Sequence, residues 1–227
     1  MRSTLPSQAD TPLRKSDRDR RTTPHAEADG GEPFGRLLPW LLLLGGLAGA
    51  LAAFVLTVEK IELLTDAAYV PTCSINPVLN CGSIMRTDQA EVFGFPNPLL
   101  GLAGFPVLAA TGAVLLAGAR LRRWYWLGLQ AGAIAGAVFV GWLIFQSLYR
   151  IGALCPYCMV VWAVVLPTFW YVTLANLRRG VFGTRARDSR AAAVLVGNHA
   201  VVLTVAYLTV LALILERFWD YWSTLLP

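Results

Sequence analysis

The chain has 227 residues, of which 56% are hydrophobic and 15% are charged, and its formal net charge is +5. A soluble domain carries about 25% charged residues, so this chain has too few charges to cover a water-soluble globule. The composition excludes a soluble enzyme, a disordered protein and a DNA-binding domain. It indicates an integral membrane protein in contact with the lipid bilayer, with no nucleic acid as a partner.

Residues 1–36 carry 13 of the 33 charged side chains. They lack an apolar period and are predicted to form a disordered tail. Five apolar stretches follow, each as long as the roughly 20 residues that a helix needs to cross a bilayer. They run over Leu37–Val58, Pro98–Gly118, Trp124–Tyr149, Leu154–Leu177 and Ala191–Leu215. The first is too long for the apolar region of a signal peptide and is interpreted as a retained span.

The basic residues indicate the orientation of these spans. Fifteen of the 19 Lys and Arg lie in the tail, in the loop between the second and third spans and in loop 178–190. The opposite side holds Lys60, Arg86, Arg150 and Arg217. Because basic loops stay in the cytoplasm, the N-terminus is predicted to be cytoplasmic. The outer loop 59–97 and the C-terminal tail 216–227 are then extracytoplasmic.

The outer loop is rich in turn formers, and within it Ser83–Val92 is predicted to form a short amphipathic helix against the membrane. Asn97 and Pro98 match a helix N-cap followed by a proline at the first helical position. Close approach of the spans is expected at Gly45, Gly49, Gly101 and Gly104.

The four cysteines all lie on the predicted outer side, where disulfides persist. Cys155 and Cys158 form a C-x-x-C motif at the start of the fourth span, so both sulfurs lie on one helix face. Unpaired amides at the helix start favour a thiolate and lower the cysteine pKa. Cys73 and Cys81 lie on a loop that can move. Two such pairs at a membrane surface could pass electrons by thiol–disulfide exchange.

Two other interpretations of the cysteines remain open. They could form two inert structural disulfides, although a C-x-x-C bridge on a helix is strained and easily reduced. They could bind zinc, although structural zinc sites usually show two closely spaced cysteine pairs, and the seven residues between Cys73 and Cys81 do not fit that spacing. We expect no metal.

The combination of Cys73-x7-Cys81, Thr87, the segment Phe93–Asn97 and Cys155-Pro156-Tyr157-Cys158 resembles the vitamin K epoxide reductase family, in particular its actinobacterial branch. The resemblance covers roughly residues 37–177. It implies a four-helix bundle around a quinone, followed here by a fifth transmembrane helix. It also implies oxidation of secreted thioredoxin-fold proteins. Many bacterial members carry a fused thioredoxin-like domain after the fifth span. This chain stops at Pro227, so its partner is expected to be a separate DsbA-like protein.

The resemblance also implies roles for single residues. Cys158 faces the quinone and Cys155 is its resolving partner, while Cys81 exchanges with Cys155 and Cys73 is attacked by the partner's thiol. Asn97 corresponds to an asparagine that hydrogen-bonds a quinone carbonyl. Thr87, Met85 and Trp162 are the further candidates for quinone binding. Vertebrate members have a tyrosine at the position of Trp162, whose indole donates a hydrogen bond but does not accept one.

The sequence therefore predicts a thiol:quinone oxidoreductase of the bacterial inner membrane that supports disulfide formation, with menaquinone as the expected quinone. Three alternatives remain. A DsbB-type enzyme has four spans and its cysteine pairs in two outer loops. Electron flow in the opposite direction would make the quinone or its epoxide the important substrate. A membrane scaffold with structural disulfides belongs to a different class.

Overall fold

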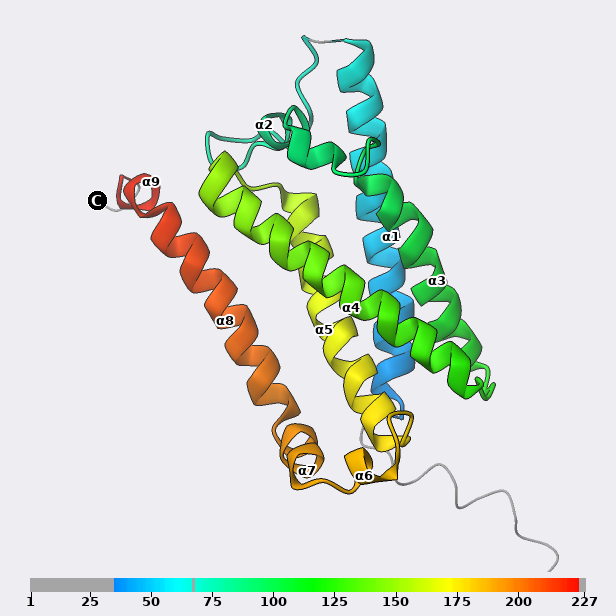
Figure 1. Ribbon diagram of the computed structural model, residues 1–227. Helices are drawn as coiled ribbons and strands as arrows, with labels where there is room; N and C mark the ends of the chain where they lie inside the picture. Colours follow the sequence, from blue (N-terminus) through cyan, green and yellow to red (C-terminus); the bar gives the residue numbers. More distant parts are fainter. Residues whose placement is uncertain (1–34, 67, 225–227) are drawn as a thin grey trace, which may run out of the picture. The chain divides into compact units, whose positions relative to one another are not determined.

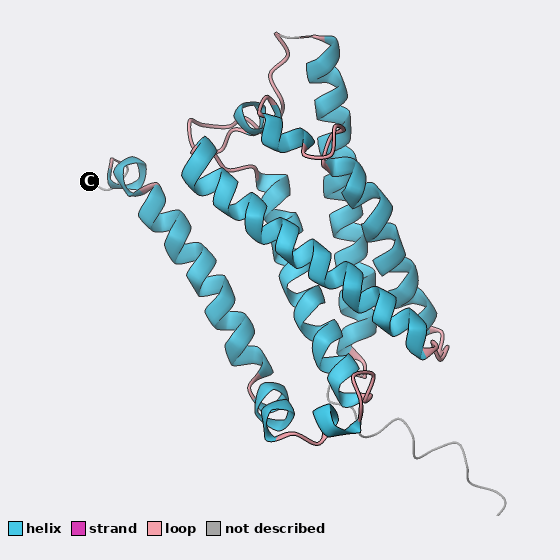
Figure 2. Cartoon of the chain, in the orientation of Figure 1, coloured by secondary structure: helices cyan, strands magenta, loops and turns pink. Residues whose placement is uncertain are grey.

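The computed structural model describes residues 35–66 and 68–224. The predicted tail, residues 1–36, therefore lies outside the described residues except for its last two. The described chain is helical, and its one strand-like pairing is an isolated bridge between Leu79 and Leu154. The elements, drawn in Figure 1 and Figure 2, are α1 Leu37–Thr65, α2 Cys81–Met85, the 3-10 helix η3 Asp88–Glu91, α3 Pro98–Leu116, α4 Arg123–Phe145, the π-helix η4 Gln146–Ile151, α5 Pro156–Arg178, α6 Thr184–Arg187, α7 Arg190–Gly197, α8 His199–Arg217 and α9 Trp219–Ser223.

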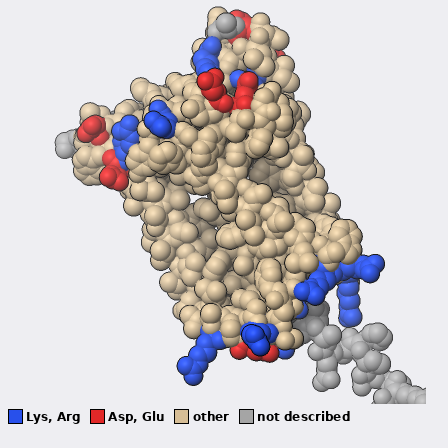
Figure 3. Space-filling view, in the orientation of Figure 1, with Lys and Arg blue, Asp and Glu red and all other residues tan. Residues whose placement is uncertain are grey.

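Among the described residues, five helical segments are long and apolar enough to cross a membrane, namely Leu37–Thr65, Pro98–Leu116, Arg123–Ile151, Pro156–Arg178 and His199–Arg217. Figure 3 shows one face of the described chain, on which charged side chains gather at the two ends and an uncharged band lies between them. Such a band suits the bilayer interior, where charged groups are costly. The prediction of an all-α integral membrane protein is confirmed.

α1 continues to Thr65, beyond the predicted end of the first span at Val58. Its final turns carry Glu59 and Lys60, which the sequence assigned to the outer loop. Both residues are buried, with exposed fractions of 5% and 7%. A buried charge needs partners, and both residues find them in the loop that follows α1. These contacts allow the helix to continue past the end of the apolar stretch.

α1 packs closely against α3 at two glycines. A Cβ atom on Gly46 of α1 would lie 2.4 Å from the backbone nitrogen of Ala109, and one on Gly112 of α3 would lie 2.4 Å from the backbone nitrogen of Leu43. The neighbouring atoms belong to helix backbones, which cannot move aside as a side chain can. Glycine is therefore required at both positions, and the sequence analysis identified neither of them.

The four glycines that were predicted to permit close approach differ from one another in the space around their Cβ positions. A Cβ on Gly49 would come within 2.4 Å of an α3 side chain, and one on Gly101 within 2.8 Å of an α1 side chain. Gly45 meets a side chain of α5 at 3.2 Å. The prediction for Gly104 is wrong, because no heavy atom lies within 4 Å of its Cβ position. This glycine lines a cavity instead of a helix contact.

The fifth apolar stretch is not the single helix that was predicted over Ala191–Leu215. It divides at Asn198, whose backbone N–H and side-chain Nδ2 donate to the carbonyl of Val194 at 2.9 and 3.0 Å. Gly197 precedes this asparagine, and both residue types are poor helix formers. The helix long enough to span the membrane is α8, His199–Arg217.

The end of α8 is tied to the segment that leads to the C-x-x-C motif. Arg217 Nε donates to the carbonyl of Leu148 in η4 at 2.7 Å. η4 ends at Gly152, which has a φ of 71° and so adopts the left-handed conformation that glycine tolerates. The chain then reverses and reaches Cys155 in three residues. The fifth span thus supports the entry to the motif from outside the four-helix bundle.

The outer segment between α1 and α3 also differs from its prediction. The single helix expected over Ser83–Val92 is divided into α2 and η3, and the hydroxyl of Thr87 donates to the carbonyl of Ile84 where α2 ends. Pro98 begins α3 as predicted, but the side chain of Asn97 does not cap that helix. Asn97 has helical backbone angles, φ −52° and ψ −34°, whereas a capping residue is non-helical.

Candidate active site

A backbone bridge brings the two cysteine segments together. The N–H of Leu154 donates to the carbonyl of Val78 at 2.7 Å, and the N–H of Asn80 donates to the carbonyl of Leu154 at 2.9 Å. Asn80 directly precedes Cys81, and Leu154 directly precedes Cys155. The bridge therefore fixes the positions of these two cysteines relative to each other, although 74 residues separate them in the sequence.

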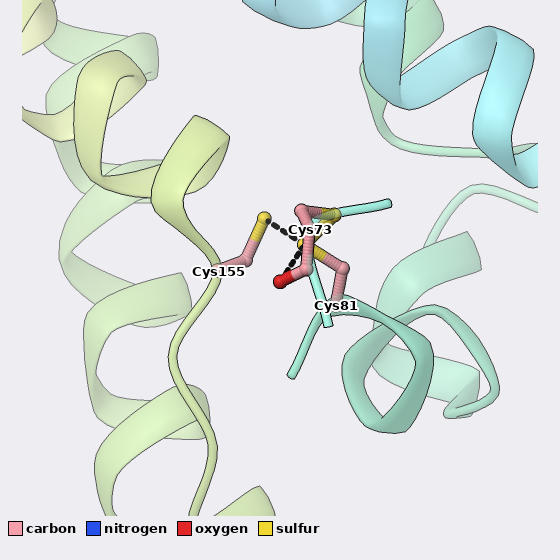
Figure 4. Close-up of side chains that lie close together, drawn as sticks. All are labelled: Cys73, Cys81 and Cys155. Carbon is pink, nitrogen blue, oxygen red and sulfur yellow. Dashed lines mark hydrogen bonds between the residues drawn. A yellow bond between two sulfur atoms is a disulfide. The ribbon is translucent and has the colours of Figure 1, made fainter. Parts of the chain in front are cut away.

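Three sulfur atoms gather at this bridge. Cys73 and Cys81 form a disulfide. The Sγ atom of Cys81 lies 3.2 Å from that of Cys155, and all three sulfurs lie within 4.8 Å of one another (Figure 4). Cys155 and Cys158 are free thiols. Two of the three clustered sulfurs are bonded to each other, whereas a zinc site uses thiolates. The cluster is arranged for exchange between a disulfide and a thiol.

Cys155 lies at the N-terminus of α5, where its sulfur accepts a hydrogen bond from the N–H of Cys158 at 3.4 Å. The hydrogen bond from the Cys158 side chain lowers the pKa of the Cys155 thiol, and burial and the charge of Glu59 oppose this effect only in part. The sequence predicted a low pKa in this motif, and the hydrogen bonds assign it to Cys155. A thiolate is the species that attacks a disulfide.

The low pKa of Cys155 can be measured in a variant that lacks Cys73 and Cys81. Thiolate absorbance in the ultraviolet is expected to rise at a pH below the ordinary cysteine pKa of about 8.5. A further Cys158→Val change removes the hydrogen bond with the largest effect, so the pKa of Cys155 is expected to rise. An unchanged titration curve in the valine variant would contradict the assigned cause.

A cavity of about 730 Å³ lies below the sulfur cluster. α1, α3, α4 and α5 all contribute lining residues, most of them apolar, which identifies these helices as one bundle around the cavity. Cys81, Cys155 and Cys158 line it. The cavity volume falls in the range of about 300–1,000 Å³ that is usual for ligand sites. The cysteines are thus placed between the outer surface and an apolar site inside the bundle.

Three of the four residues predicted to bind a quinone line this cavity: Met85, Asn97 and Trp162. Thr87 is not one of the lining residues. The Nδ2 atom of Asn97 donates to the carbonyl of Gln89 at 2.7 Å, and its Oδ1 atom accepts from the N–H of Val92 at 3.2 Å. One N–H of the Asn97 amide is not used by these bonds.

Three buried polar atoms of cavity-lining residues have no hydrogen-bond partner among the described residues. They are the Nε1 of Trp162, which is 3% exposed, the Oε1 of Gln146 and the Oγ1 of Thr168. Buried polar groups are normally hydrogen-bonded, so each unpaired one needs an explanation. A donor and an acceptor that face an apolar cavity fit a ligand that carries polar oxygen atoms.

A profile of the vitamin K epoxide reductase family matches residues 40–173. The chain belongs to this family. No curated protein matches it by sequence. Vitamin K epoxide reductase domains are quinone-linked thiol oxidoreductases of membranes, and the resemblance to this family is confirmed. The cavity fits a quinone, because its walls are apolar and the unpaired Trp162 Nε1 can donate to a carbonyl oxygen.

In this member of the family, the segment before Cys73 is held by Glu59, which sequence reasoning did not single out. The carboxylate accepts hydrogen bonds from the hydroxyl of Tyr69 at 3.0 Å and from the N–H and hydroxyl of Thr72. The bond to Glu59 raises the pKa of Tyr69. One signal in the sequence could have identified Glu59: it is followed by a basic residue, and the two come directly after a long apolar stretch.

Cys73 is only 5% exposed, so its sulfur can be attacked from outside only after the neighbouring loop opens. Glu59→Gln removes the charge that holds this loop. A hydrogen bond to a charged group contributes about 1.5–3 kcal/mol, so reduction of the Cys73–Cys81 disulfide by a small thiol is expected to be at least about 10-fold faster. Stopped-flow reduction measures this rate. The exposed Glu62→Gln is the matched control, and equal rates for the two variants would contradict the assigned role.

Proposed function

We propose that the protein is a thiol:quinone oxidoreductase that reoxidises a DsbA-like thioredoxin-fold protein and so supports disulfide formation. The observation that carries this proposal is the sulfur cluster. The 3.2 Å separation of the Cys81 and Cys155 sulfurs joins a loop disulfide to a C-x-x-C pair that lines an apolar cavity. An inert pair of structural disulfides needs neither this proximity nor the cavity.

In the proposed route, the partner's thiolate attacks Cys73 and breaks the Cys73–Cys81 disulfide. A second partner thiol resolves the mixed disulfide, and the loop pair is left as two thiols. Cys81 then attacks Cys155 and releases Cys158. Cys73 attacks Cys81, which restores the loop disulfide and releases Cys155 as a thiolate. The net result is one disulfide formed in the partner and one reduced C-x-x-C pair.

The state with a Cys73–Cys81 disulfide and two free thiols in the C-x-x-C motif is the one that this exchange produces. Cys158 is the sulfur proposed to face the quinone, and Cys155 re-forms the disulfide with it. A bound quinone accepts the two electrons and two protons and is released as the quinol. We propose that Met85, Asn97 and Trp162 hold it, and that it is menaquinone. Thr87 does not line the cavity and is not part of this set.

The direction of electron flow follows from the reduction potentials. DsbA-type proteins have potentials of about −120 mV, so only an acceptor of comparable or higher potential can reoxidise them. A lipid-soluble quinone meets this requirement and can reach a cavity inside the bundle. The chain therefore transfers electrons from secreted proteins into the membrane.

We propose that residues 37–177 are the catalytic domain and that the protein lies in the bacterial inner membrane with a cytoplasmic N-terminus. The distribution of Lys and Arg supports this orientation. It places the sulfur cluster and the C-terminal tail on the oxidising side. The loop 178–190 then lies in the cytoplasm, and the fifth helix returns the chain to the outer side.

The proposal is tested by measuring quinone reduction by the purified protein in detergent, with a reduced DsbA-like protein as the electron donor. Donor-dependent quinol formation is expected for the wild type and is expected to disappear in Cys158→Ala. Equal rates for the two proteins would exclude the relay and leave structural disulfides as the better account. A menaquinone analogue and a ubiquinone analogue, compared in the same assay, identify the preferred quinone.

A further inference from the structure

Lys60 is a buried cation that the relay of cysteines does not use. Its exposed fraction is 7%, and it lines the same cavity as Cys155 and Cys158. Its Nζ donates to the carbonyl of Met85 at 2.6 Å and pairs with Glu91 Oε1 at 2.8 Å. An ammonium group has three donors, so these two contacts leave one N–H for a ligand. A charge in an apolar cavity is costly to bury.

The partner of Lys60 connects the cavity to the surface. The side chain of Glu91 is 38% exposed, whereas that of Lys60 is 8% exposed. Glu91 belongs to η3, which lies in the outer segment together with the sulfur-bearing loop. The ion pair therefore begins at a carboxylate in contact with water and ends at an ammonium group on the cavity wall. This order suits the transfer of a proton from solvent into the bundle.

The chemistry of the cavity requires such a transfer. When Cys155 is a thiolate and Cys158 a thiol, their oxidation forms one S–S bond and releases two electrons and one proton. Formation of a quinol takes two electrons and two protons. One proton must therefore come from a group other than the two sulfurs. The proposed exchange releases Cys155 as a thiolate, so this deficit arises in the route itself.

We propose that Lys60 supplies the missing proton to the quinone oxygen and that Glu91 returns a proton from water to Lys60. This inference rests on the proposed quinone reduction. In the step, an N–H bond of Lys60 breaks and an O–H bond of the quinol forms. The neutral amine then regains its proton through the Glu91 carboxyl group. The ammonium also stabilises negative charge as it develops on the oxygen.

Substitution of Lys60 by arginine tests whether the residue acts as a proton donor or only as a fixed positive charge. Lys60→Arg keeps the positive charge and the donors to Met85 and Glu91, but a guanidinium does not lose its proton in proteins. Lys60→Met removes both the charge and the proton. Glu91→Gln keeps an acceptor for Lys60 but cannot carry a proton. If Lys60 only held the outer segment in place, the arginine variant would be active.

The experiment follows the two half-reactions of the full-length protein separately. The first is reduction of the Cys73–Cys81 disulfide by dithiothreitol, and the second is oxidation of the reduced protein by a short-chain naphthoquinone. Binding of the same quinone is measured by quenching of tryptophan fluorescence. Loss of a general acid lowers a reaction rate about 100-fold or more. Lys60→Met and Lys60→Arg are therefore both expected to slow the second half-reaction to this extent. The first half-reaction is expected to keep its wild-type rate.

Each other outcome overturns an identified part of the inference. Oxidation of Lys60→Arg at the wild-type rate would assign Lys60 a role in charge or positioning alone. Equal slowing of both half-reactions, with weaker quinone binding, would reduce Lys60 to a support of the outer segment. A wild-type rate in Glu91→Gln would remove Glu91 from the route. Failure of the quinone to oxidise the wild-type protein itself would instead reject the proposed function.

Discussion

The double variant Cys73→Ala/Cys158→Ala is expected to form a Cys81–Cys155 disulfide in nearly every molecule. The two remaining sulfurs lie 3.2 Å apart and are held there by the bridge between Leu79 and Leu154. Because neither cysteine keeps its original partner in this variant, no other disulfide within the chain competes. Non-reducing digestion followed by mass spectrometry identifies the linked peptides. The same variant is expected to have no donor-dependent quinone reduction.

The matched control is Cys73→Ala/Cys155→Ala, which keeps Cys81 and Cys158. It also leaves one cysteine from each pair, but the sulfur of Cys155 is the one that belongs to the cluster with Cys73 and Cys81. Cross-linking is expected to be slow and incomplete in the control. Equal cross-linking in the two variants would mean that Cys81 has no preferred partner in the C-x-x-C motif, which is the basis of the proposed route.

Gly46→Ala is expected to disrupt the packing of α1 against α3. The new Cβ would lie 2.4 Å from the backbone nitrogen and 2.8 Å from the Cα of Ala109, so the two helices must separate to accommodate it. Overpacking typically lowers the free energy of unfolding by about 1–3 kcal/mol. Because the new methyl group meets helix backbone, the loss is expected at the upper end of this range or above it. Thermal unfolding in detergent measures the loss. The cavity lies between the same helices, so quinone binding is expected to weaken as well.

Gly141→Ala in α4 is the control for this substitution. No heavy atom lies within 4 Å of the Cβ position of Gly141, so the methyl group meets open space. Replacing glycine by alanine in a helix is favourable by about 1 kcal/mol, so this variant is expected to be at least as stable as the wild type. An equally stable Gly46→Ala variant would show that α1 and α3 are not in the close contact described.

The sequence was sufficient to predict the helical membrane fold, because length and the absence of charge decide whether a segment can cross a bilayer. It was less reliable for boundaries. Glu59 and Lys60 ended the predicted first span, yet they continue α1 because the outer loop supplies partners for their charges. The reverse occurred at Gly197 and Asn198, two poor helix formers that divide an apolar stretch into α7 and α8.

The cavity could be predicted only in part. Of the four residues predicted to bind a quinone, Met85, Asn97 and Trp162 line it, whereas Thr87 does not. Gly46 and Gly112 were missed, because a glycine in a helix contact and a glycine that lines a cavity look alike in the sequence. The difference depends on which neighbouring helix faces each glycine, and that is a property of the tertiary structure.

By itself the sequence determined the class of this protein and the chemistry available to it: five apolar segments, and four cysteines in a loop pair and a C-x-x-C pair. Composition and local spacing are sufficient for such conclusions. Only the tertiary structure decided how close the Cys81 and Cys155 sulfurs lie, that Glu59 holds one side of the loop, and that Lys60 lines the cavity. These features depend on contacts between residues far apart in the chain, and their distances are fixed by helix packing and by one backbone bridge.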